Sequence, residues 1–103
     1  MKHLNIKIYG KVQGVFYRAT AKAVADQLGV KGFVKNEKDG SVYVEAEGDD
    51  FSLGEFLEFC HKGSDRAIVE KIETTEAELK NYRNFDILKR KASPQPPPKE
   101  SGL

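Results

Sequence analysis

The chain has 103 residues, of which 39% are hydrophobic and 32% charged, and its net charge is +1. This balance predicts a single globular domain and argues against a generic, strongly basic nucleic-acid binder. No run approaches the roughly 20 apolar residues of a membrane span, and the N-terminus lacks the apolar stretch of a signal peptide. Because Cys60 is the only cysteine, no C-x-x-C pair exists, and the sequence predicts a soluble, cytoplasmic protein.

The first predicted elements are a strand and a helix. Apolar and polar residues alternate over residues 4–8, which predicts a half-buried strand. From Arg18 to Leu28 the apolar positions follow helical spacing, and Gly29 is suited to end this helix. The pattern therefore changes from strand to helix across residues 10–18.

A hairpin and a second helix are predicted next. Residues 30–35 and 42–46 each have a strand pattern, and Asp39-Gly40 between them indicates a two-residue hairpin. We therefore expect these strands to be antiparallel neighbours. One residue of the pair Asp49-Asp50 can cap the second helix, whose apolar stripe includes Cys60. We interpret this cysteine as a small buried hydrophobe rather than a catalytic thiol.

The last predicted elements, over residues 67–87, complete the order of strands and helices. Residues 67–75 predict a strand, residues 76–81 a loop or short helical turn, and residues 85–87 a short final strand. The order β-α-β-β-α-β predicts an α+β, ferredoxin-like split β-α-β fold: a four- to five-stranded antiparallel sheet with two helices on one face. We expect this domain to span residues 1–91. Residues 92–103 contain four prolines and no apolar period, which indicates a disordered or polyproline-like tail.

The segment that joins the first strand to the first helix is the part most informative about chemistry. Gly10 and Gly14 allow the backbone to bend sharply there, and N–H groups next to a helix N-terminus can bind phosphate. Arg18 stands in the first helical turn, where its planar guanidinium can contact two phosphate oxygens. A surface ion pair is the alternative role for Arg18. The spacing differs from that of a nucleotide-binding P-loop, so we expect no ATP site.

Two motifs resemble those of the acylphosphatase family. Residues 10–18, G-K-V-Q-G-V-F-Y-R, are similar to its signature G-x-V-Q-G-V-x-F-R. Residues 32–36 (G-F-V-K-N) and 39–42 (D-G-S-V) are similar to its second block, G-W-V-x-N followed by D-G-x-V. Tyr17 replaces the usual Phe and Phe33 the usual Trp, and the proline-rich tail is not part of the family pattern. The resemblance covers the chain from the first predicted strand to the last.

The resemblance implies a hydrolase that needs no metal and no cofactor. Its substrate is an acyl phosphate, and its products are a carboxylate and inorganic phosphate. Arg18 is implied to bind the phosphoryl group, and Asn36 to orient the attacking water. The implied phosphate-binding residues are Gln13, Gly14, Val15, Phe16, Tyr17 and Arg18. These roles fit a reaction that depends mainly on positioning and charge. We further expect a monomer with no nucleic-acid or membrane partner.

Two non-catalytic classes are compatible with the same fold. Lys31-Gly32-Phe33-Val34 resembles the start of an RNP1 motif, but the third strand offers only Tyr43 as a stacking aromatic for RNA. A module that binds small anions without turnover is the other alternative. Asn36 distinguishes a hydrolase from a module that only binds anions. Hydrolysis needs an aligned water, whereas binding needs only Arg18 and the glycine-containing segment before it. By position alone Asn36 would be interpreted as a turn residue.

Overall fold

The computed structural model describes residues 1–89. Its elements are β1 (Lys2–Lys11), α1 (Tyr17–Leu28), β2 (Lys31–Asn36), β3 (Val42–Gly48), α2 (Asp50–Lys62), β4 (Ile68–Ala77) and β5 (Phe85–Leu88). This order confirms the predicted β-α-β-β-α-β arrangement, with a fifth strand. Neither described helix is long and apolar enough to cross a bilayer. The tail expected at residues 92–103 lies outside the described residues, so the domain boundary stays a prediction.

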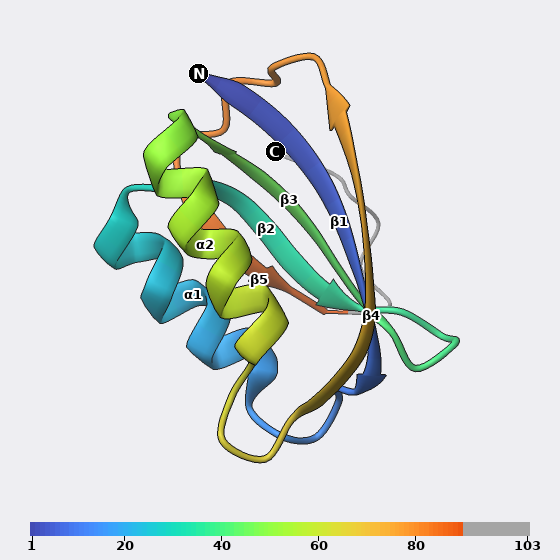
Figure 1. Ribbon diagram of the computed structural model, residues 1–103. Helices are drawn as coiled ribbons and strands as arrows, with labels where there is room; N and C mark the ends of the chain where they lie inside the picture. The colour runs from blue at the N-terminus through green and yellow to red at the C-terminus, as the bar shows by residue number, and fades with distance from the viewer. Residues whose placement is uncertain (90–103) are drawn as a thin grey trace.

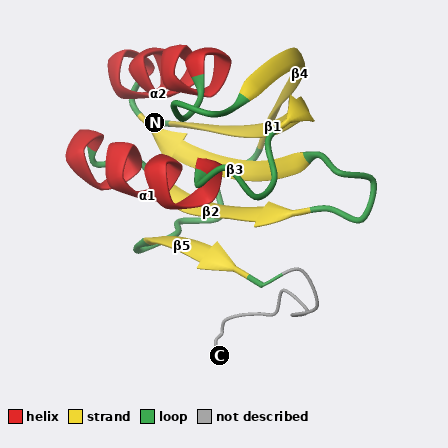
Figure 2. Cartoon of the chain, turned by 90° about the horizontal axis from the view of Figure 1, so that it is seen from below, coloured by secondary structure: helices red, strands yellow, loops and turns green. Residues whose placement is uncertain are grey.

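The sheet has five strands in the order β4-β1-β3-β2-β5, and both helices cover the same face (Figures 1 and 2). The pairs β1–β3, β1–β4 and β2–β3 are antiparallel, as predicted. β5, however, pairs in parallel with β2, so the expectation of an entirely antiparallel sheet is wrong for this strand. β4 ends beside the start of β1, at the end of the sheet where β2 also begins. The chain crosses to the other edge at this end, and β5 therefore runs in the direction of β2.

The hydrophobic core lies between the sheet and the two helices. Alternate residues of the central strands point toward the helices, as the period of a strand requires. The core contains Ile6, Ile8, Val34, Val42, Val44 and Ala46 from the sheet, with Ala21, Ala25, Leu53, Phe56 and Cys60 from the helices. Burial raises the pKa of the Cys60 thiol to about 12, which agrees with its interpretation as a small buried hydrophobe.

The helix ends follow the predicted signals. Gly29 ends α1 with a φ of 76°, in the left-handed region. Asp49 is the N-cap of α2, and its carboxylate accepts a hydrogen bond of 2.7 Å from the Ser52 N–H. His61 lies in the last turn of α2, where a basic side chain opposes the negative end of the helix dipole.

The β2–β3 hairpin differs from its prediction. Asn36 pairs with Val42, and the Glu37 N–H donates to the Ser41 carbonyl, so the loop contains three residues rather than two. The Gly40 N–H donates to the Glu37 carbonyl, and Gly40 has a φ of 92°. A turn followed by one left-handed residue gives this longer hairpin, and the Asp-Gly signal alone does not distinguish it from the two-residue form.

A buried polar cluster lies on the sheet face away from the helices. The Glu47 carboxylate contacts His3 Nδ1 at 2.7 Å and accepts hydrogen bonds from the backbone N–H groups of Lys80 and Tyr82, at 2.5 and 3.0 Å. The Tyr82 hydroxyl donates to Glu45 at 2.6 Å. These bonds hold the segment between β4 and β5 against the sheet while it crosses from one edge to the other.

Candidate active site

The connection from β1 to α1, residues 12–16, is called the cradle loop below. Gly14 and Phe16 have φ values of 73° and 63°, so the backbone is left-handed at both. Phe16 is the N-cap of α1, and no side chain caps this helix end. Within residues 1–89, the N–H groups of residues 14–19 form no hydrogen bond with a protein acceptor. They are therefore donors available to an anion at a positive helix end.

One flank of the cradle loop is fixed to the β2–β3 hairpin. The side-chain amide of Gln13 donates to the carbonyl oxygens of Glu37 and Ser41, both at 2.8 Å. The hairpin is itself ordered by Asp39, which accepts from the Ser41 N–H at 3.0 Å and pairs with Lys7 at 3.3 Å. The hydrogen bonds from Ser41 lower the pKa of Asp39 to about 2, so it stays ionised at neutral pH.

The other flank is fixed to α2 and the segment that follows it. The Ser64 hydroxyl donates to the Val15 carbonyl at 2.6 Å, and the Tyr17 hydroxyl donates to the Cys60 carbonyl at 2.7 Å. Tyr17 is buried, and this burial raises the pKa of its phenol, which keeps the hydroxyl a donor. The bonds on both flanks leave the N–H groups of the cradle loop free.

Arg18 lies in the first turn of α1, as predicted. It lines a hollow of about 300 Å³ together with Gly14 and Phe16 of the cradle loop and Ile87 of β5. The guanidinium forms no ion pair with a carboxylate of residues 1–89, and the first turn of α1 contains no acidic residue. The alternative role in a surface ion pair is therefore not seen in this part of the chain. Its charge is available to a ligand.

Asn36 is the last residue of β2, so it belongs to the strand and not to the turn. Two residues before it, Val34 is fully buried against the helices, and alternation places Asn36 on the same face. The Asn36 Oδ1 atom is buried without a hydrogen-bond partner among the described residues. Buried acceptors are nearly always paired, and an unpaired one costs about 1–3 kcal/mol. This oxygen is thus suited to accept a hydrogen from a water.

The structure brings the predicted site residues to one end of the sheet. The Gln13 bond to Glu37, the residue after Asn36, places the end of β2 beside the cradle loop. The sequence analysis named Gln13 as a phosphate-binding residue and missed its side-chain bonds to the hairpin, and it missed Ser64 entirely. Residues 1–89 contain no group of three or more His, Cys, Asp or Glu side chains arranged to hold a metal ion. Whether the reaction is metal-free stays a prediction.

Comparison with known proteins decides the family. The acylphosphatase family model matches residues 4–87. The chain belongs to the acylphosphatase family. An acylphosphatase of Ligilactobacillus salivarius is 41% identical over 88 residues, which cover 84% of this chain and 98% of the relative. One from Archaeoglobus fulgidus is 42% identical over 84 residues, or 82% of this chain and 94% of the relative.

The fold comparison agrees with this assignment. The crystal structure of acylphosphatase from Bacillus subtilis superposes with a TM-score of 0.83 at 36% identity, and the match covers 85% of this chain and 99% of that one. The resemblance of the two motifs is thereby confirmed at the level of the family. Acylphosphatases are hydrolases, so the chain is an enzyme that acts on acyl phosphates.

Proposed function

We propose that the cradle loop and Arg18 bind the phosphoryl group of the acyl phosphate and that Asn36 orients the attacking water. The buried, unpartnered Oδ1 of Asn36 beside the cradle loop carries this proposal. The free N–H groups of residues 14–19 and the guanidinium supply positive charge for the phosphoryl oxygens. Preorganised donors of this kind stabilise the charge that spreads over those oxygens in the transition state.

The water is positioned by an acceptor that needs no tuned pKa. Asn36 Oδ1 accepts one hydrogen of the water and leaves an oxygen lone pair free to face the phosphorus. The new bond joins the water oxygen to phosphorus, and the bond from phosphorus to the carboxyl oxygen breaks. The leaving group departs as a carboxylate, which is stable without a strong general acid. The products are the carboxylate and inorganic phosphate.

The proposal also includes the absence of a nucleic-acid partner and a cytoplasmic location. The net charge of +1 supports an enzyme without a nucleic-acid partner. The unpaired, buried thiol of Cys60 suits a reducing cytoplasm.

A direct assay tests the reaction type. We expect the enzyme to hydrolyse benzoyl phosphate at an unchanged rate in excess chelator and to leave p-nitrophenyl phosphate, a monoester, intact. Inorganic phosphate is expected to inhibit competitively, because it fills the same cradle. Loss of activity in chelator, or a lack of phosphate inhibition, would contradict the proposed site.

The Gln13 side chain is expected to set the distance between the phosphorus and the water. Replacement of Gln13 by Glu removes the NH₂ donor with little change in shape and turns a carboxylate toward the carbonyls of Glu37 and Ser41. We expect kcat for benzoyl phosphate to fall about tenfold, because the cradle loop and Asn36 lose their alignment. The carbonyls of Glu37 and Ser41 each lose one of two donors and face a carboxylate instead, so the free energy of unfolding should fall by about 2 kcal/mol.

The control for this variant is the same change on the exposed side of α1. Gln27 is exposed, and Gln27→Glu should leave both kcat and the unfolding free energy close to wild type. Steady-state kinetics and urea unfolding measure the two quantities. Wild-type kcat in Gln13→Glu would show that the hydrogen bonds from Gln13 to the hairpin play no part in alignment.

A further inference from the structure

Phe16 is an outlier in two respects. Its φ of 63° is a left-handed value that bulky residues rarely adopt and that glycine adopts without strain. Its side chain is 76% exposed, so it adds little to the core. The conformation is held by Thr20, whose N–H and hydroxyl both donate to the Phe16 carbonyl, at 3.1 and 2.8 Å. Folding therefore does not explain an aromatic ring at this position, and backbone strain of this kind is often found at functional sites.

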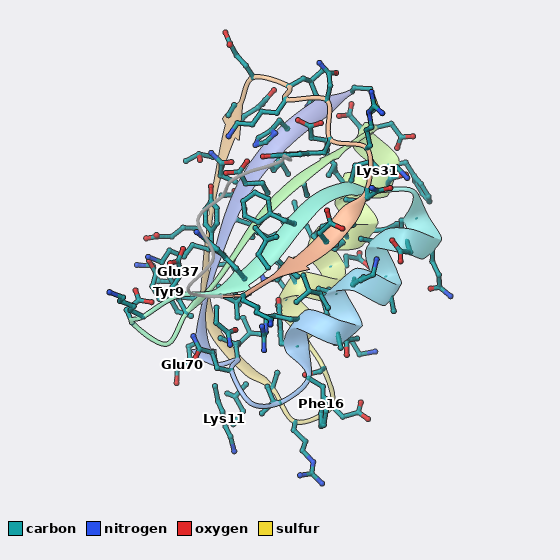
Figure 3. The ribbon with its side chains drawn as sticks, turned by 180° about the vertical axis from the view of Figure 1, so that it is seen from behind. Tyr9, Lys11, Phe16, Lys31, Glu37 and Glu70 are labelled. Carbon is teal, nitrogen blue, oxygen red and sulfur yellow. The ribbon has the colours of Figure 1, made fainter. Side chains whose placement is uncertain are left out.

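Phe16 lies at the end of the molecule where β1 ends, near Lys11 (Figure 3). It lines two hollows there. One is the hollow that contains Arg18. The other, of about 480 Å³, lies between the cradle loop and the segment from α2 to β4. Phe59 lines it, together with the charged residues Lys62, Asp65 and Arg66.

The direction of the reaction distinguishes the two hollows. In phosphoryl transfer the attacking and leaving oxygens lie roughly in line on opposite sides of the phosphorus. The cradle loop leaves β1, and in the sheet order Asn36 on β2 lies to one side of β1 while β4 lies to the other. Residues 62–66, which line the second hollow, lead from α2 to β4, so this hollow lies on the β4 side. With water held by Asn36, in-line departure would direct the acyl group toward this second hollow.

We propose that Phe16 and the second hollow bind the acyl portion of the substrate and favour aromatic or other bulky apolar acyl groups. This inference rests on the proposed roles of Arg18 and Asn36. The ring of Phe16 packs on one face of the acyl group, and Phe59, which also lines the hollow, extends the apolar surface. An acetyl group is too small to reach this surface from the cradle, so the ring contributes to the binding of large acyl groups and not of small ones.

The test compares two substrates in one variant. Phe16→Gly removes the ring and keeps a residue suited to the left-handed backbone, so the cradle loop is preserved. We expect the ratio of kcat/KM for benzoyl phosphate to kcat/KM for acetyl phosphate to fall about tenfold, because any change in the cradle loop affects both substrates alike and only the large acyl group loses contact with the ring. The control is Phe51→Ala, because Phe51 is 74% exposed in the first turn of α2, at the end of that helix remote from the second hollow.

The outcomes separate this inference from the proposed function. Equal losses for both substrates in Phe16→Gly would overturn the acyl site, because the ring would then support the cradle and not the acyl group. Unchanged kinetics for both substrates would overturn it as well. Failure of the proposed residue roles is seen independently, as full activity of Arg18 or Asn36 variants toward acetyl phosphate.

Discussion

Replacement of Arg18 by Ala is expected to lower kcat/KM for benzoyl phosphate about 1000-fold, by analogy with the loss of an arginine that stabilises a transferring phosphoryl group. The guanidinium has no ion-pair partner among residues 1–89, so its loss breaks no such contact and should reduce stability little. Both KM and the inhibition constant of inorganic phosphate should rise at least tenfold, because the same group acts in binding and in turnover. Steady-state kinetics at constant ionic strength measure these changes.

A second variant at Arg18 and a control variant isolate the contribution of the planar guanidinium group. Arg18→Lys keeps the charge but loses the planar pair of donors, so we expect activity between that of the Ala variant and wild type. Arg83→Ala removes an exposed arginine from the segment that crosses the other face of the sheet, and it should leave kcat/KM unchanged. If Arg18→Ala kept wild-type phosphate inhibition, Arg18 could not be the residue that closes the phosphate site.

Replacement of Asn36 by Ala is expected to lower kcat about 100-fold, the loss typical of one group that aligns a reactant or stabilises the transition state. KM should change little, because the cradle loop and Arg18 still hold the phosphoryl group. The Asn36 Oδ1 atom has no partner among the described residues, so the unfolding free energy should stay within about 1 kcal/mol of wild type. Kinetics and thermal unfolding on the same preparation measure both quantities.

The matched control for Asn36 is Asn84→Ala, since Asn84 is exposed and only its backbone carbonyl bonds to β2. This variant should have wild-type kcat. A kcat for Asn36→Ala within threefold of wild type would contradict the role of the amide in orienting the water. A large fall in unfolding free energy would instead point to a structural role for Asn36.

Local pattern was sufficient to predict most of the fold. The alternation in β1, the helical stripe of α1 and the acidic cap at Asp49 each depend on residues close in sequence, and each prediction is confirmed. The direction of β5 depends instead on where the chain crosses the sheet. That path is held by hydrogen bonds from the backbone of residues 80–82 to Glu47, more than 30 residues earlier, which no local pattern indicates.

The candidate site, like the fold, was predictable from sequence only in part. The motif spacing predicted Arg18 and the cradle loop, and the structure shows an uncapped helix end at that place. The bonds that fix the loop join residues far apart, as in the 49-residue separation of Ser64 from Val15. The resemblance of the second motif implied a role for Asn36, but only the three-dimensional packing shows that its oxygen is buried and unpartnered. Sequence thus indicated the groups that act on the substrate and not the contacts that position them.

The most direct test measures phosphate binding and turnover separately in the two site variants. Isothermal titration calorimetry with inorganic phosphate gives Kd for wild type, Arg18→Ala and Asn36→Ala, and benzoyl phosphate gives kcat for the same samples. We predict that Asn36→Ala binds phosphate within about twofold of wild type and still loses about 100-fold in kcat, whereas Arg18→Ala loses both. A parallel loss of phosphate binding and turnover in Asn36→Ala would contradict the division between holding the phosphoryl group and orienting the water.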